Sequence, residues 1–348
     1  MASRPYFIIM KNEKKKEIIL GSIRIIAFVL VFFVLLELLS LKVFNSDNGV
    51  EEIKLLADAY SFTEDDDYKT DIVCVGSSDM YSGFVPVDLW DGFGYTSVVS
   101  CFSHQTVNEA KMMLRQIQKN QDVKLVFLEV DTVYDGRDID SKALGREYSS
   151  FSRLFEEVNP ELFESEVKRL FPALIFHNTW KKENKGSLRH PYSHGYLYNN
   201  DVVYNDETDY MKPTDEIDMP ISSNAMALKS FAKYCSEQGI SLVFVEMPSS
   251  YSWNYARYNA IKEIADEVGV DFLDLNLMYE EIGINQRNCY RDGGSHLNYD
   301  AAKKVTEFLG KYIKENYPEL QDHRDDAEYS ARWNEDSVNF KKINNIDR

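Results

Sequence analysis

Short apolar runs alternate with longer amphipathic stretches between residues 70 and 316. The apolar runs predict β-strands at residues 71–76, 96–102, 123–131, 240–248 and 270–275. Apolar residues at helical spacing predict helices at residues 106–119, 223–238, 255–267 and 299–316. The central run VKLVFLEVD (123–131) is continuously apolar before its acidic end, as expected for a strand buried on both faces of a parallel sheet. The alternation indicates an α/β fold, whose functional sites form beyond the carboxyl ends of the strands.

A separate apolar segment precedes this pattern. Residues 18–41 read IILGSIRIIAFVLVFFVLLELLSL, with no charged residue or helix breaker between Ile25 and Leu36. A helix of this length, rising about 1.5 Å per residue, can cross a bilayer. Lysines precede the segment and acidic residues follow it, so the positive-inside rule puts the N-terminus in the cytoplasm and residues 44–348 outside. A cleaved signal peptide is the alternative, although the flank LKVFNSDNG lacks an A-x-A-like cleavage site.

The chain is therefore expected to have a modular organisation. The predicted parts are a cytoplasmic N-terminus (1–17), a transmembrane anchor (18–43), a stalk (44–69), an extracytoplasmic domain (70–319) and a polar C-terminal tail (320–348). Residues 135–222 interrupt the alternation with polar, aromatic-rich sequence and predict an insertion over the strand ends, with helical patterning near 150–172. The charged tail, poor in aliphatic residues, is expected to be a mobile terminus.

Composition excludes one class of partner. A formal net charge of −18 over 348 residues argues against a nucleic-acid-binding surface, which needs a basic footprint. The hydrophobic content of 44% predicts a packed core. Neither the cysteines nor the histidines of the insertion, His190 and His194, have a metal-ligand spacing, so no metal and no cofactor is expected. Cys74 and Cys101 end two predicted strands and form either a disulfide or, the favoured interpretation, two buried free thiols.

The first predicted strand ends at a glycine that is followed by two serines, in the sequence GSSD (76–79). A serine between a buried strand and a helix exposes its hydroxyl beside backbone N–H groups, which suits a nucleophile and an oxyanion hole. The same position suits a helix N-cap, whose hydroxyl only accepts a backbone hydrogen bond. The tetrapeptide alone does not separate the two interpretations.

A second loop offers a general base. Residues 290–304 read YRDGGSHLNYDAAKK and lead into the last predicted helix. An aspartate a few positions before His296 can orient the imidazole and stabilise its cation, and the histidine can then take a proton from a serine on another loop. The alternative is a histidine with no role beyond a glycine-rich turn at a helix start. Together, the two loops predict a Ser-His-Asp site.

On these two motifs the chain resembles the SGNH/GDSL hydrolase superfamily. It looks most like the membrane-anchored bacterial proteins that act with a membrane-bound O-acyltransferase, such as the DltD-type protein of lipoteichoic acid D-alanylation and the alginate- and peptidoglycan-acetylation proteins. The resemblance covers residues 70–316 and implies a three-layer α/β/α, flavodoxin-like fold around a parallel sheet. It matches Ser78, not Ser77, to the nucleophile and His296 to the base. Asp292 forms D-x-x-x-H, one residue longer than the family's D-x-x-H.

The resemblance also implies an oxyanion hole, to which the Ser78 N–H contributes. The segment SCFSHQTVNEA (100–110) resembles a related S-G-Q segment, with His104 in place of the glycine. Ser103 and Gln105 are the candidate further donors, and Asn108 is held in reserve. Helix capping or surface exposure is the alternative for each of these three residues.

Further candidates follow two other strands. Trp253, Tyr255 and Arg257 are candidate residues of an acceptor groove, because aromatic faces often carry sugar rings; ordinary loop packing is the alternative. Glu129 and Asp131 end the central strand and either cap nearby backbone or polarise the site.

These observations predict a membrane-anchored, extracytoplasmic serine acyltransferase or esterase. His296 deprotonates Ser78, the serine attacks an ester, and a sugar hydroxyl or water takes the acyl group. The resemblance implies O-acyl groups of a cell-surface polysaccharide or teichoic-acid-like polymer as substrate, and a membrane-bound O-acyltransferase as partner. The alternative is a catalytically weak or inactive glycan-binding accessory protein, because Asp292 is displaced and the oxyanion glycine is missing.

Overall fold

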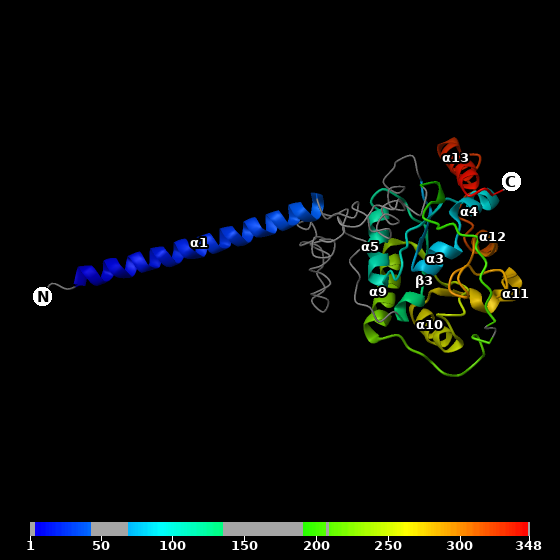
Figure 1. The fold of residues 1–348 in the computed structure, drawn as a ribbon, viewed down its shortest axis with the longest axis horizontal. Coiled ribbons are helices and arrows are strands. Elements are labelled where there is room, and N and C mark those ends of the chain that lie inside the picture. The colour runs from blue at the N-terminus through cyan, green and yellow to red at the C-terminus, as the bar shows by residue number, and fades with distance from the viewer. Residues whose placement is uncertain (1–3, 43–68, 135–190, 207–208, 347–348) are drawn as a thin grey trace.

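The computed structural model describes residues 4–42, 69–134, 191–206 and 209–346. Helix α1 (Arg4–Lys42) contains the apolar segment, and its window Lys15–Leu36 has a mean hydropathy of 2.8 with exposed side chains (Figure 1). By length and composition this helix can cross a membrane, and a signal sequence has the same properties. The predicted apolar helix is therefore present.

Five parallel strands form one sheet in the order β2-β1-β3-β4-β5. Each strand lies inside a run that the sequence predicts: β1 (Ile72–Val75), β2 (Ser97–Val99), β3 (Leu125–Glu129), β4 (Ser241–Glu246) and β5 (Asp271–Asp274). The strands are shorter than the apolar runs because only the paired residues belong to the ladder. Their carboxyl ends meet at one edge of the sheet, and the GSSD motif follows β1 there.

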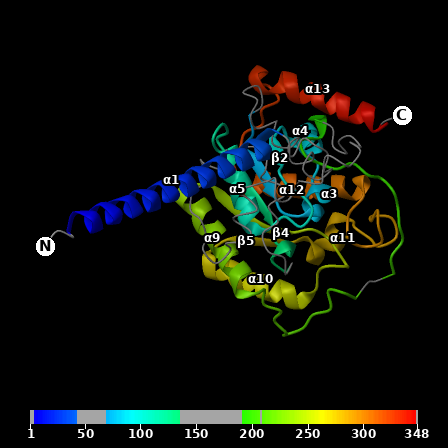
Figure 2. The same ribbon diagram turned by 60° about the vertical axis from the view of Figure 1, so that its left-hand side comes forward.

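The alternation along β1 explains the three layers. Ile72 and Cys74 belong to the core cluster formed with α3 (Ser78–Gly83), α4 (Pro86–Phe93) and α12 (Tyr299–Asn316). Val73 and Val75 belong to the cluster formed with α5 (Val107–Ile117), α9 (Ser222–Gln238) and α10 (Tyr255–Val268). Side chains of successive strand residues point to opposite faces, so an apolar run needs helices on both sides. Figures 1 and 2 show these two groups of helices on either side of the strands. The predicted three-layer α/β/α fold is confirmed.

The long helices agree with the sequence pattern. The bounds of α5 (Val107–Ile117), α9 (Ser222–Gln238), α10 (Tyr255–Val268) and α12 (Tyr299–Asn316) lie within two residues of the predicted ranges. The sequence pattern did not predict the short elements, which are α3 (Ser78–Gly83), α4 (Pro86–Phe93), η2 (Asp131–Tyr134), η6 (Pro191–Ser193), η7 (Leu275–Met278) and α11 (Tyr279–Ile282). Each has too few residues to show a helical repeat of apolar positions.

The C-terminal segment is a packed part of the domain, and the prediction of a mobile polar tail is wrong. Asp326 caps a helix, α13 (Ala327–Ile343), on which Trp333 and Phe340 are each 1% exposed. The Trp333 ring stacks on Trp90, with a centroid distance of 5.6 Å, and on His194, at 3.9 Å. Trp333 and Phe340 are seven positions apart and therefore lie on one face of α13. This face packs against the domain, although most other positions of the helix are polar.

The described residues of the predicted insertion that surround His194 lie beside β2. The N–H of Val99 donates to the carbonyl of His194 at 2.9 Å, and the buried His194 ring pairs with Asp336 of α13 through Nε2 at 3.0 Å. The helix predicted near residues 150–172 lies outside the described residues. All four cysteines are buried thiols, and the Cys101 thiol donates to the Cys74 carbonyl at 3.4 Å, so the buried-thiol interpretation of Cys74 and Cys101 is confirmed over the disulfide.

Replacing Trp333 tests whether α13 belongs to the folded domain. Trp333→Ala should lower the free energy of unfolding by about 3–5 kcal/mol, because it removes a large buried side chain and leaves a cavity. Val338→Ala on the same helix is the control: this side chain is 64% exposed, and its loss should cost less than about 0.5 kcal/mol. Urea unfolding of the full-length chain in detergent, followed by circular dichroism, measures both. Equal effects would contradict the packing of α13.

Candidate active site

The two serines after β1 occupy different structural positions. Ser77 is the N-cap of α3: its Oγ accepts a hydrogen bond from the Asp79 N–H at 3.3 Å, and the residue is 5% exposed. Ser78 is the first helical residue and is partly exposed. Its hydroxyl makes no hydrogen bond within the part of the chain that the structure describes. The capping interpretation therefore applies to Ser77, and the Ser78 hydroxyl is left available for chemistry.

Two buried side chains hold the peptide groups that precede Ser78. The Gly76 N–H donates to Gln105 Oε1 at 3.0 Å, and the Ser77 N–H donates to Glu129 Oε2 at 2.6 Å. Gly76 has a φ of +149°, and a Cβ there would lie 2.5 Å from the Glu129 Cβ. Only glycine permits this approach, because a side chain would be both strained and in collision.

Asp292 reaches His296 in spite of the extra residue between them. Its Oδ1 accepts hydrogen bonds from the N–H groups of His296 at 2.9 Å and Ser295 at 3.2 Å, and its Oδ2 contacts the imidazole Nδ1. Gly293 and Gly294 adopt φ values of +86° and +125°, which turn the chain back on itself. The carboxylate can therefore fix the imidazole orientation, as the acid of a triad does.

Electrostatics keep Asp292 ionised. Burial alone would raise the pKa of this carboxyl group. The hydrogen bonds from the His296 ring and N–H, together with the charges of His296 and Arg291, outweigh burial and lower the pKa below its usual value. An ionised Asp292 is the form that stabilises an imidazolium.

The other ring nitrogen of His296 faces the first turn of α3. Nε2 lies 3.5 Å from Oδ1 of Asp79, the residue that follows Ser78. Helices α3 and α12 pack together, and His296 lies in the loop that leads into α12, three residues before its first residue. No hydrogen bond joins Ser78 to His296 among the described residues. Such nucleophile–base hydrogen bonds are often long until a substrate binds.

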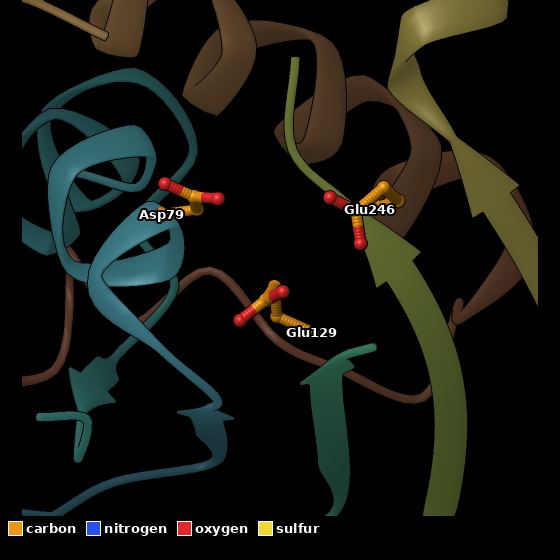
Figure 3. Close-up of side chains that lie close together, drawn as sticks. All are labelled: Asp79, Glu129 and Glu246. Atoms are coloured by element: carbon orange, nitrogen blue, oxygen red, sulfur yellow. The ribbon is translucent and has the colours of Figure 1, made fainter. Parts of the chain in front are cut away.

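Three buried carboxyl groups lie close together next to His296, and the sequence pattern did not identify them as a group. Asp79 comes from α3, Glu129 from the end of β3 and Glu246 from the end of β4, and Figure 3 shows them facing a common space. Burial first, and then neighbouring carboxylates, raises the pKa of Asp79 and of Glu246 well above the usual values. The signal in the sequence is an acid that ends an apolar run, as in VFLEV and VFVEM.

Glu129 has the capping role that was one of its two predicted roles. Besides the Ser77 N–H, it accepts the Asp131 N–H through Oε1 at 2.7 Å. The side chain is fully buried, and these two backbone hydrogen bonds give each of its oxygens a donor.

The predicted oxyanion donors separate into two groups. Gln105 is fully buried, and its Nε2 donates to the Ser100 carbonyl at 3.1 Å, so its amide supports the loop; the prediction that it reaches a substrate is wrong. Ser103 and Asn108 are partly exposed, and their roles stay predictions. His104 has a φ of +58°, the left-handed conformation that glycine favours, at the position where the resembled segment has glycine.

The predicted acceptor-groove residues do not act as one surface. Trp253 is 2% exposed and donates through Nε1 to Asp274 at 2.8 Å, so it belongs to the core, and the prediction that it lines a groove is wrong. Arg257 packs over the Tyr134 ring at 4.2 Å. Tyr255 lines a pocket of about 490 Å³ between residues 210–218 and the start of α10.

No protein-family model matches the chain, and no curated protein matches its sequence. Among solved structures, it is similar to one from Streptococcus pneumonia named for platelet activating factor, with 11% identity and a TM-score of 0.41 over 76% of this chain and 92% of that chain. It is also similar to the lipase/acylhydrolase from Enterococcus faecalis, with 10% identity and a TM-score of 0.36 over 72% and 97% of the two chains. It is similar as well to a catalytic mutant of an acetylxylan esterase from Geobacillus stearothermophilus, with 11% identity and a TM-score of 0.35 over 71% of this chain and 93% of that chain. The functional assignment rests on the geometry of the site itself.

Gly76→Ala tests the close approach of β1 and β3. The new Cβ would collide with Glu129 and impose a strained φ, so the free energy of unfolding should fall by at least about 2 kcal/mol. Gly92→Ala is the control, because Gly92 lies in α4 with no atom within 4 Å of an added Cβ. This change should stabilise the chain by about 0.5–1 kcal/mol. Chemical unfolding of both variants decides, and a neutral Gly76→Ala would refute the contact.

Proposed function

We propose that the protein is a membrane-anchored, extracytoplasmic serine esterase or acyltransferase that acts on O-acyl groups of a cell-surface polysaccharide or teichoic-acid-like polymer. The observation that carries the proposal is the contact of His296 with Asp292 on one side and with the first turn of α3 on the other. That turn begins at Ser78, whose hydroxyl has no hydrogen-bond partner among the described residues.

In the proposed reaction His296 accepts the Ser78 proton through Nε2 while the serine oxygen attacks the ester carbonyl carbon. Asp292, ionised and bound to Nδ1, stabilises the imidazolium. The tetrahedral oxyanion lies at the start of α3, where the Ser78 N–H can donate to it, with Ser103 or Asn108 as a further donor. Collapse of the intermediate breaks the ester C–O bond, His296 returns the proton to the leaving alcohol, and Ser78 holds the acyl group as a new ester.

The second half-reaction decides between the two activities. A water or a sugar hydroxyl gives its proton to His296 and attacks the acyl-enzyme carbonyl, which releases Ser78. Water makes the protein an esterase, and a polymer hydroxyl makes it an acyltransferase. The apolar helix α1 and the resemblance to O-acyltransferase-associated proteins support a membrane-bound O-acyltransferase as the partner that supplies acyl groups.

Substitution of the serines tests the nucleophile. Ser78→Ala and His296→Ala in the full-length chain should each lower turnover of an activated acetate ester by at least about 10³-fold. Ser77→Ala is the matched control: it should cost about 1 kcal/mol of stability through the lost cap and leave most of the turnover. A serine-directed fluorophosphonate should label the wild type at Ser78. A folded protein that is neither labelled nor active would instead favour the accessory glycan-binding role.

Asp292→Asn tests the acid of the proposed Ser78-His296-Asp292 triad. An asparagine cannot hold the same imidazole tautomer, so kcat should fall by at least about 10²-fold while KM changes little. Asp300→Asn, four residues beyond His296 and exposed at the start of α12, is the control and should retain wild-type kinetics. Steady-state kinetics on the activated ester measure both variants. An unchanged kcat in Asp292→Asn would remove this residue from the mechanism.

A further inference from the structure

The three buried carboxylates of Asp79, Glu129 and Glu246 form a compact group of oxygen atoms. One ligand atom from each side chain lies within 4.8 Å of the others, and the residues are 6%, 0% and 0% exposed. The fold enforces this meeting: β3 and β4 are adjacent parallel strands in which Glu129 lies opposite Val245, so Glu246 is one residue further along. Asp79 closes the group from α3 (Figure 3).

Glu246 is the member that the protein leaves unpartnered. Both of its oxygens are buried, and neither has a hydrogen-bond partner within the described residues. Figure 3 shows its carboxylate directed toward the space between Asp79 and Glu129. A buried carboxylate without a donor is costly unless it is paired or coordinates a metal ion.

The charges around Glu246 do not supply the missing partner. Burial of Glu246, followed by the nearby carboxylates of Glu129, Asp131, Asp79 and Asp274, raises its pKa and favours the neutral form. The neighbouring Glu129 accepts the N–H groups of Ser77 and Asp131, so it offers Glu246 no donor. The site therefore brings acidic oxygen atoms together, and those of Glu246 have no donor among the described residues.

The separations suit a single ion. Hard divalent cations bind carboxylate oxygens at about 2.0–2.6 Å, so two ligands of one ion lie up to about 5 Å apart. An all-oxygen donor set favours Ca²⁺, Mg²⁺ or Mn²⁺ over softer metals, which prefer nitrogen and sulfur. Each carboxylate can also coordinate through either oxygen, and water can complete the shell.

We propose that Asp79, Glu129 and Glu246 bind one hard divalent cation between the carboxyl ends of β3 and β4 and the first turn of α3. The ion compensates the three buried carboxylates and holds together the elements that carry Ser77 and Ser78. The ion site borders the proposed catalytic residues, because Asp79 Oδ1 lies 3.5 Å from His296 Nε2, but binding of the ion is measured without the Ser78 reaction.

Direct binding to the full-length chain in detergent tests the proposal. After treatment with EDTA and its removal, the wild type should bind one equivalent of Mn²⁺, followed by the loss of the free-ion electron paramagnetic resonance signal. Saturating Ca²⁺, Mg²⁺ or Mn²⁺ should raise the midpoint of thermal unfolding by a few degrees over the metal-free protein. Both readouts are independent of esterase activity.

Two substitutions make the test specific. Glu246→Gln keeps the side-chain size and should weaken Mn²⁺ binding by at least about tenfold, as one ligand is worth at least that factor. Asp79→Asn should weaken it similarly. The control Glu263→Gln changes an exposed carboxylate on α10 and should bind as the wild type does.

The proposal is overturned if the wild type binds no Mn²⁺ and no cation shifts its unfolding midpoint. It is also overturned if folded Glu246→Gln and Asp79→Asn bind Mn²⁺ with wild-type affinity. If the thermal unfolding midpoint rises in Glu246→Gln and no cation shifts the midpoint of the wild type, the carboxyl groups are instead neutral and protonated.

Discussion

The close approach of β1 and β3 at Gly76 is the constraint on which the site depends. Glu129 ends β3, and its carboxylate accepts the Ser77 N–H at 2.6 Å across the strand pair. Gln105 holds the Gly76 N–H from the other side at 3.0 Å. Both peptide groups before Ser78 are therefore fixed by buried side chains, and the direction in which α3 leaves the sheet follows. A residue with a Cβ at position 76 would separate the strands.

This constraint places negative charge inside the protein. Burial and neighbouring carboxylates raise the pKa of Asp79 and of Glu246, so the folded state binds these protons more tightly than the unfolded state does. Their contribution to stability is fully present below the unfolded pKa values, near 4, and is lost as pH rises through the raised folded values. A bound divalent cation would oppose that loss, because it stabilises the same groups in their ionised form.

The sequence predicts the long elements, whose pattern of apolar positions is clear, but not the features that depend on backbone conformation or strand order. Helix α12 agrees with its predicted bounds because eighteen residues show a clear apolar face, whereas α3 has six residues and no visible repeat. Parallel strand ends meet at one edge, and there His296 Nε2 lies 3.5 Å from Asp79, the residue after Ser78; the pairing of Ser78 with His296 stays a prediction. The fit of Asp292 depends on two positive φ angles, and the meeting of Glu129 with Glu246 depends on strand order; neither can be read from residue types.

Asp79 explains how His296 remains available to Ser78. Asp79 follows Ser78 in the chain. Its Oδ1 faces the His296 Nε2 at 3.5 Å, which is longer than an ordinary hydrogen bond. An ionised Asp79 would bind an imidazolium and compete with the serine for the base. Burial, followed by the charges of Asp131, Glu129 and Asp292, raises the pKa of Asp79 and favours its neutral form. The buried carboxylates therefore weaken the attraction between Asp79 and His296, which leaves the imidazole to the Ser78 hydroxyl in the proposed reaction.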